Sequence, residues 1–163
     1  MAELLKATGI YYRNELRSIH KNGVKLQPVY EAFTNSWESI LEKYTADHLN
    51  LGSIVIEFHY DAGMYEEDNE NNLKILQKII ITDNGIGLNE ESFTRLLNLR
   101  DNSKSKNNKG TGRIQYLHYF DYTIFESVYK VGNNNFRKIG LTLSKKEAFL
   151  QENAILRKDF DEE

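Results

Sequence analysis

Helical spacing of apolar residues marks the segment VYEAFTNSWESILEKY, residues 29–44, as the longest predicted helix of the chain. Proline fits a first helical turn, and Pro28 stands immediately before this segment. The apolar side, which we expect to pack on the core, consists of Phe33, Trp37, Ile40, Leu41 and Tyr44. The opposite, polar side consists of Glu31, Asn35, Glu38 and Glu42, flanked by the small residues Ala32, Ser36 and Ser39.

Two strands are predicted after this helix. Residues 53–60, SIVIEFHY, alternate apolar and polar side chains, and residues 73–82, LKILQKIIIT, are rich in branched ones. We expect the second strand to be antiparallel to the first and central in a sheet. The acidic segment 61–72 lacks the ligand spacing of a calcium loop and is predicted to be a solvated connection. Asn89 is placed to cap a helix that begins after it.

The ends of the chain carry weaker patterns. An N-terminal extension, residues 1–27, begins with a short helical pattern. The C-terminal part adds a short helix, two strands around a Gly-Asn turn and a closing helix, at residues 113–120, 122–130, 136–144 and 145–156. The region 145–163 is therefore predicted to be a C-terminal helix followed by an acidic tail.

Composition narrows the class of protein. A chain of 163 residues with 40% hydrophobic and 12% aromatic residues suits one domain with a core, over residues 1–163. The net charge of −3 gives no global argument for nucleic acid or a membrane surface. No cysteine is present, which excludes disulfides and thiolate metal sites. The sequence contains no apolar run of about 20 residues and no signal pattern, so we expect a soluble, cytoplasmic protein.

Asp83 is the first candidate for binding chemistry. It ends a predicted strand and is followed by Gly85 and Gly87. A carboxylate only accepts hydrogen bonds, so this residue suits an exocyclic amine such as that of adenine. Glycines beside it would let a flat ring approach the backbone. Asp-Asn-Gly is also a common turn, and that alternative stays open.

Two further segments suggest phosphate and metal chemistry. Glu31 and Asn35 are neighbours at i, i+4 on the predicted helix, and such a pair can hold a water and a metal ion. The alternative is an ordinary solvated helix face. The loop 100–113 has no large apolar residue, and its Gly110-Thr111-Gly112 opens a helix, as anion sites do. Its basic residues include Lys104, Lys106, Lys109 and Arg113. The alternative is a flexible basic loop or a patch for a nucleic-acid backbone.

Taken in this order, three segments resemble the sequence boxes of the GHKL superfamily. This superfamily is the ATP-binding domain of gyrase-type topoisomerases, Hsp90 chaperones, histidine kinases and MutL-type repair proteins. Residues 31–38, EAFTNSWE, resemble its first box, and residues 83–87, DNGIG, resemble its second box closely. Residues 107–112, NNKGTG, resemble its glycine-rich lid. The likeness covers about residues 28–130; the second box is the most specific and the lid box the least.

The resemblance implies roles for these residues. Glu31 would be the general base that polarises the attacking water, and Asn35 would bind Mg²⁺. Asp83 would accept the adenine amine in a pocket that Gly85 and Gly87 shape. Around the phosphates, in a lid at 100–113, would lie Lys104, Gly110, Thr111, Gly112 and Arg113, with Glu38 near the pocket. Histidine kinases usually carry asparagine where Glu31 stands, so this residue argues for hydrolysis.

The resemblance also implies the fold and the activity. The predicted fold is α+β, a two-layer α/β sandwich of the Bergerat type, with a mostly antiparallel mixed sheet and helices on one face. The predicted activity is Mg²⁺-dependent ATP hydrolysis in a chaperone-, DNA repair- or defence-like machine. Its partner would be a second copy in a homodimer or a neighbouring domain. The alternatives are an ATP-sensing switch without turnover and a nucleic-acid-binding module that uses the 100–113 loop.

Several departures from the family pattern bear on turnover. Asn107 stands where the lid usually has its first glycine, and Thr34 replaces a common aspartate. The Gly-Thr pair that relatives carry on a late strand is missing, and Thr142 is a poor substitute. The domain that sends a lysine or arginine to the γ-phosphate is also missing. Two interpretations stay open: a fragment of a longer protein, or a shortened member with weak turnover.

Overall fold

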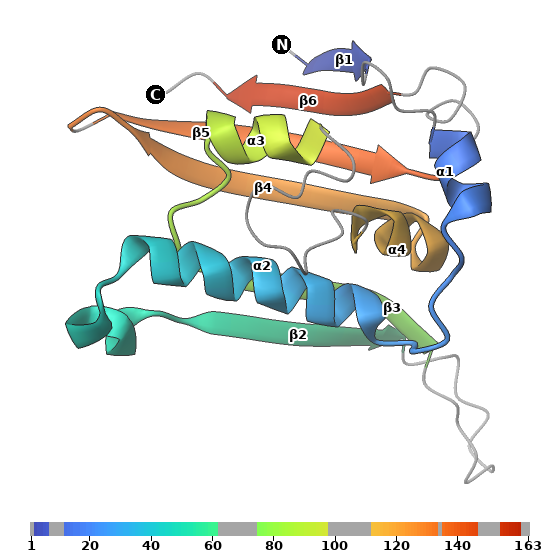
Figure 1. Cartoon of the computed structure of the whole chain (residues 1–163), viewed down its shortest axis with the longest axis horizontal. Helices are drawn as coiled ribbons and strands as arrows, with labels where there is room; N and C mark the ends of the chain where they lie inside the picture. Colours follow the sequence, from blue (N-terminus) through green and yellow to red (C-terminus); the bar gives the residue numbers. More distant parts are fainter. Residues whose placement is uncertain are drawn as a thin grey trace, which may run out of the picture. The chain divides into compact units, whose positions relative to one another are not determined.

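A computed structural model describes residues 2–6, 12–61, 75–97, 112–133, 135–146 and 154–160. Over these residues the chain is of mixed α+β class, with two antiparallel sheets and several helices (Figure 1). It divides into two compact units, one made of Met1–Glu31 with Ile86–Glu163 and the other of Ala32–Gly85. The helix α2 (Gln27–Lys43) begins in the first unit and continues into the second. None of the described helices has the length and apolar character needed to cross a membrane.

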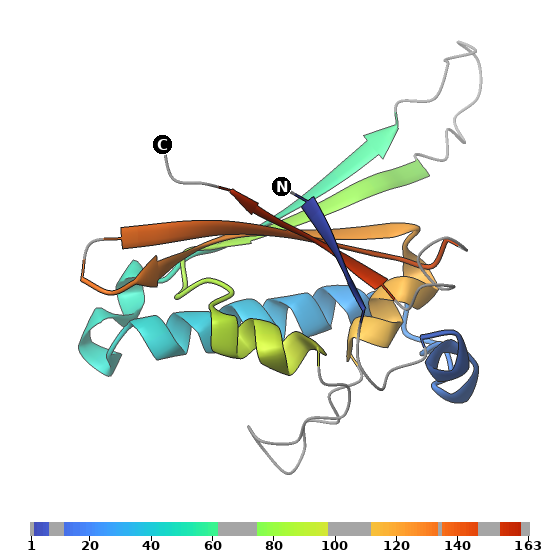
Figure 2. The same ribbon diagram turned by 90° about the horizontal axis from the view of Figure 1, so that it is seen from above.

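The first unit is built on a four-stranded antiparallel sheet. In spatial order its strands are β1 (Ala2–Lys6), β6 (Ala154–Phe160), β5 (Asn135–Ser144) and β4 (Tyr122–Val131). The helices of this unit include α1 (Tyr12–Ser18), α3 (Glu90–Leu97) and α4 (Gly112–Tyr119). Figure 2 shows α3 and α4 on the same face of β4 and β5.

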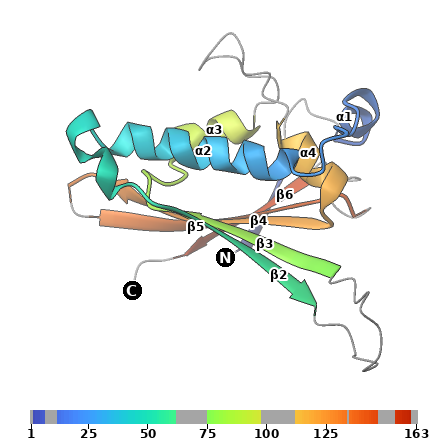
Figure 3. The ribbon, with the colours of Figure 1, turned by 90° about the horizontal axis from the view of Figure 1, so that it is seen from below.

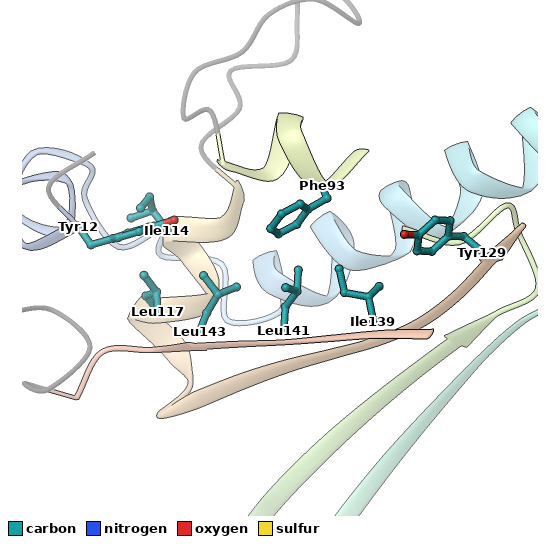
Figure 4. Packing of buried hydrophobic residues seen from close by; sticks show 8 residues of the cluster. All are labelled: Tyr12, Phe93, Ile114, Leu117, Tyr129, Ile139, Leu141 and Leu143. Carbon is teal, nitrogen blue, oxygen red and sulfur yellow. The ribbon is translucent and has the colours of Figure 1, made fainter. Parts of the chain in front are cut away.

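The core of the first unit lies between that sheet face and the helices (Figure 4). Alternation along β5 turns Ile139, Leu141 and Leu143 inward, and each of these side chains is at most 2% exposed. They meet Phe93 of α3 and residues of α1, α4 and β4, namely Tyr12, Ile114, Leu117 and Tyr129. The predicted strands 122–130 and 136–144 and the predicted helix 113–120 are therefore confirmed.

Helix α3 begins as the sequence predicts. The side-chain oxygen of Asn89 accepts a hydrogen bond from the Ser92 amide at 2.8 Å. This bond satisfies one of the amides that a helix leaves without a partner in its first turn. Asn89 is therefore confirmed as the cap of this helix.

The predictions for the first residues of the chain and for its closing helix and tail are wrong where the structure describes them. Residues 2–6 form the strand β1 rather than a helix. Residues 154–160 form the strand β6 rather than the end of a closing helix and the start of an acidic tail. The two strands pair antiparallel, with Ala2 opposite Lys158. Short segments with mixed preferences take the conformation that a distant partner strand stabilises, which local pattern does not reveal. Residues 147–153 lie outside the described part of the chain.

The second unit holds a two-stranded antiparallel sheet of β2 (Ile54–Asp61) and β3 (Ile75–Asp83), preceded by a 3₁₀ helix, η1 (Ala46–Leu51). Both strands and their antiparallel pairing are confirmed. The expectation that the second strand is central is wrong, because among the described residues β3 pairs with β2 alone. The middle of the acidic connection, residues 62–74, lies outside the description.

The predicted core stripe of helix α2 is buried only in part. Ile40 of this stripe is buried as predicted, whereas Phe33, Trp37 and Leu41 are each more than 40% exposed. Ser36, outside the predicted stripe, is also buried. The start of β2 and the end of β3 come close to the helix, whereas the opposite ends of the two strands lead away from it (Figure 3). Gly52, for example, lies directly against the Ile40 side chain. The small residues Ser36 and Ser39 therefore allow the helix to contact the end of β3 within the second unit.

Candidate functional site

The carboxylate of Asp83 is fixed at the end of β3 by two hydrogen bonds within the second unit. Its Oδ2 accepts a hydrogen bond from the hydroxyl of Ser36 on α2 at 2.8 Å. Its Oδ1 accepts one from the main-chain amide of Gly85 at 2.9 Å. Each carboxylate oxygen has a second acceptor position. The group is therefore held in place and still able to accept a hydrogen bond from a ligand.

The sequence Asp-Asn-Gly supplies both the turn and the close packing around this carboxylate. The hydrogen bond from the Gly85 amide to Oδ1 of Asp83 closes an Asx-turn. The interpretation of Asp-Asn-Gly as a turn is therefore correct for this oxygen. Asn84 anchors the turn: its side chain accepts from the Ser53 amide at 2.8 Å and donates to the Leu51 carbonyl at 2.9 Å. The second oxygen of Asp83 takes no part in the turn and is held by Ser36 instead.

Gly85 lies in contact with α2 rather than beside an open space. A Cβ at this position would lie 2.7 Å from the main-chain carbonyl carbon of Ser39. Only glycine allows the chain to leave β3 this close to the helix. Gly85 therefore fixes the distance between α2 and the strand end that carries Asp83.

Glu31 is held within the first unit, near the first turn of α4. Its Oε1 accepts a hydrogen bond from the side-chain amide of Gln27 at 2.9 Å. Its other oxygen faces Gly112, where a Cβ would lie 2.9 Å from the carboxylate carbon of Glu31. Gly112 is the first residue of α4, whose free amides favour a negative charge.

Asn35 and Glu38 follow Glu31 along α2. Asn35 is exposed and lies one turn after Glu31, as the predicted spacing requires, while Glu38 is half-buried. The described residues contain no group of three acidic or histidine side chains that could hold a metal ion by themselves. A Mg²⁺ ion at Asn35 would therefore depend on one or two protein ligands together with phosphate oxygens and water.

Gly87 and Arg113 are packed into the first unit. Gly87 has a φ of 78° and lies against the main chain of Val128 on β4. The neighbouring Leu88 amide donates to the Ser127 hydroxyl at 2.6 Å. Arg113 is 7% exposed, and its Nη2 donates to the main-chain oxygen of Arg95 at 3.3 Å. Lys104, Gly110 and Thr111 of the predicted lid lie outside the described residues.

Two tyrosines of the first unit titrate abnormally. Burial raises the pKa of Tyr12, although the nearby Arg113 acts in the opposite direction. Burial also raises the pKa of Tyr129, and the hydrogen bond that its hydroxyl donates to Glu90 at 2.8 Å adds to the increase, while Arg137 opposes it. Both hydroxyls are thus held in the neutral form well into the alkaline range.

Sequence reasoning missed the residues that orient the two carboxylates. The sequence marks Ser36 only as a small residue, because its bond to Asp83 joins residues 47 positions apart. Gln27 stands four positions before Glu31, a spacing that puts the two side chains together on a helix. That spacing is visible in the sequence once the helix is known to begin at Gln27.

Comparisons of the chain with models of protein families, with curated proteins and with solved structures found no match. The geometry around Asp83 and Glu31 is therefore the basis for a functional proposal.

Proposed function

We propose that the chain binds ATP with Mg²⁺ and hydrolyses it, in a two-layer α/β sandwich of the GHKL type. The observation that carries the proposal is the carboxylate of Asp83, which Ser36 and Gly85 orient while each oxygen keeps an acceptor position. An acceptor held at the end of a strand suits the exocyclic amine of adenine. The pattern of the three sequence boxes supports the same ligand.

In this proposal each candidate residue has one task. Asp83 accepts the adenine amine, and Asn35 is a ligand of Mg²⁺, which neutralises phosphate charge when it is bound. Glu31 takes a proton from the attacking water. The lid at 100–113 covers the phosphates, and its closure drives association with a second copy or a neighbouring domain. Positioning and charge neutralisation supply most of the rate enhancement in such reactions.

Calorimetry with ATP and Mg²⁺ on the Asp83→Asn variant tests the adenine assignment. The amide that replaces the carboxylate has the same shape but half the acceptor capacity. We expect the affinity for ATP to fall at least about tenfold, which corresponds to the loss of about 1.4 kcal/mol. Asp61→Asn is the matched control, because Asp61 ends the other strand of the same sheet. Equal affinity of Asp83→Asn and the wild type would show that adenine does not bind there.

Phosphate release by the Glu31→Gln variant tests hydrolysis. Loss of a general base typically lowers the rate by about 10²–10⁴-fold, while the affinity for ATP should stay within about twofold of the wild type. Glu42→Gln, an exposed residue on the same helix, should leave both unchanged. Tight ATP binding by the wild type without phosphate release would favour the ATP-sensing switch instead.

The nucleic-acid alternative depends on the loop 100–113, of which the structure describes only residues 112 and 113. Its test is an affinity for DNA or RNA that falls steeply with salt and is lost when Lys104, Lys106 and Lys109 are neutralised. Binding of this kind without any affinity for ATP would replace the proposal.

A further inference from the structure

The carboxylate of Glu31 is constrained on both sides by groups of its own unit. On one side, the side-chain amide of Gln27 donates to Oε1 at 2.9 Å, from one turn earlier on α2. On the other side, Gly112 brings the main chain of α4 next to the second oxygen, Oε2. A glutamate side chain in water samples many rotamers. Contacts at both oxygens select one of them.

The orientation of the Gln27 amide follows from the chemistry of its partner. An ionised carboxylate has only acceptor positions, so the atom of Gln27 that faces it must be the nitrogen. Gln27 is itself fixed, because it is the first residue of α2 and its main-chain amide donates to the Val24 carbonyl at 3.0 Å. The donor is therefore anchored to the start of the helix.

We propose that Gln27 is a positioning residue for Glu31 and that Oε2 is the oxygen that acts as the base. This inference rests on the proposed ATP hydrolysis. In that reaction Oε2 takes one proton from water, whose oxygen bonds to the γ-phosphorus, and the bond from phosphorus to the bridging oxygen breaks and leaves ADP. The proton on Glu31 then passes to solvent. Gln27 transfers no proton: it occupies Oε1 and so turns Oε2 toward the first turn of α4.

Two variants of Gln27 separate positioning from packing. Gln27→Met keeps the length of the side chain but removes the donor, and Gln27→Lys restores an N–H donor of similar reach. We expect kcat to fall about tenfold in Gln27→Met and to stay within about threefold of the wild type in Gln27→Lys. KM, the affinity for ATP and the melting temperature should be unchanged in both. Gln77→Met, an exposed glutamine of β3, is the control.

A substitution on the opposite side perturbs the same carboxylate independently. In Gly112→Ala the new Cβ would lie 2.9 Å from the Glu31 carboxylate carbon, so the flexible end of that side chain must move. Alanine is also a better helix former than glycine. We therefore expect Gly112→Ala to lower kcat by at least about tenfold without lowering the melting temperature.

The outcomes distinguish this inference from the function on which it rests. If Glu31→Gln abolishes phosphate release while Gln27→Met keeps the wild-type kcat, the positioning role is wrong and the ATPase proposal stands. Equal losses in Gln27→Met and Gln27→Lys would assign the effect to packing and also overturn the positioning role. If the wild-type chain releases no phosphate, or Glu31→Gln releases it at the wild-type rate, both proposals fail.

Discussion

Replacing Gly87 by alanine tests how the segment between β3 and α3 packs against β4. Gly87 has a φ of 78°, a conformation that costs an L-residue about 1–2 kcal/mol. A Cβ there would also lie 2.9 Å from the Ser127 hydroxyl and 3.0 Å from the Val128 carbonyl carbon. Val128 is paired with Lys138 in the sheet, so its main chain cannot move freely. Overpacking of this kind costs about 1–3 kcal/mol more.

Gly132 provides the matched control, because it has a φ of 73° but no atom of the described residues within 4 Å of a Cβ added to it. We expect Gly132→Ala to lower the free energy of unfolding by about 1–2 kcal/mol and Gly87→Ala by about 2–5 kcal/mol.

Urea denaturation followed by far-ultraviolet circular dichroism measures both free energies of unfolding. Trp37 is the only tryptophan and lies in the second unit, so its fluorescence reports separately on that unit. Equal losses of stability in the two variants would show that Gly87 does not lie against β4 as described.

Three further outcomes follow from named contacts. Ser36→Ala removes a hydrogen bond to a carboxylate and should lower the stability of the second unit by about 1.5–3 kcal/mol in urea denaturation, and weaken ATP binding with it. Asn89→Ala removes the cap of α3 and should cost about 1 kcal/mol in the same assay. Because the folded state raises the pKa of Tyr12 and Tyr129, their contribution to stability is complete below about pH 10 and is lost as pH rises further. Unfolding titrations at pH 9 to 11 should therefore show falling stability, with a shallower fall in Tyr129→Phe.

Controls for these outcomes come from the same chain. Ser53→Ala and Asn50→Ala change exposed residues in the second unit and should leave stability within about 0.5 kcal/mol of the wild type. A Ser36→Ala variant as stable as Ser53→Ala would contradict the bond to Asp83. A Tyr129→Phe variant with the same alkaline slope as the wild type would show that this hydroxyl is not shielded from water.

Local patterns predicted the elements whose stabilising contacts are themselves local. The helix α2, the hairpin strands β2 and β3, the cap at Asn89 and the pair β4–β5 each follow from periodicity, turn residues or a capping side chain. The pairing of β1 with β6 joins segments from opposite ends of the chain, and nothing in either segment indicates it. Long-range pairing overrides the weak preferences of a five-residue segment.

The buried side of α2 shows a second limit of pattern reasoning. Large apolar residues predict burial on average, but Trp37 stays exposed while Ser36 beside it is buried. Ser36 faces the end of β3, where its hydroxyl donates to Asp83, and Ser39 one turn later lies against Gly85, so small side chains fit on this side of the helix. For the candidate site, spacing found Asp83 and Glu31, whereas their orienting partners Ser36 and Gln27 depended on contacts seen only in three dimensions.

The most direct test of the central claim is a crystal structure of the chain with Mg²⁺ and a non-hydrolysable ATP analogue. The proposal predicts the adenine amine within about 3 Å of an Asp83 carboxylate oxygen, with Ser36 still bonded to that carboxylate and a metal ion bound at Asn35. A nucleotide bound away from Asp83, or crystals grown at saturating analogue that contain none, would contradict it.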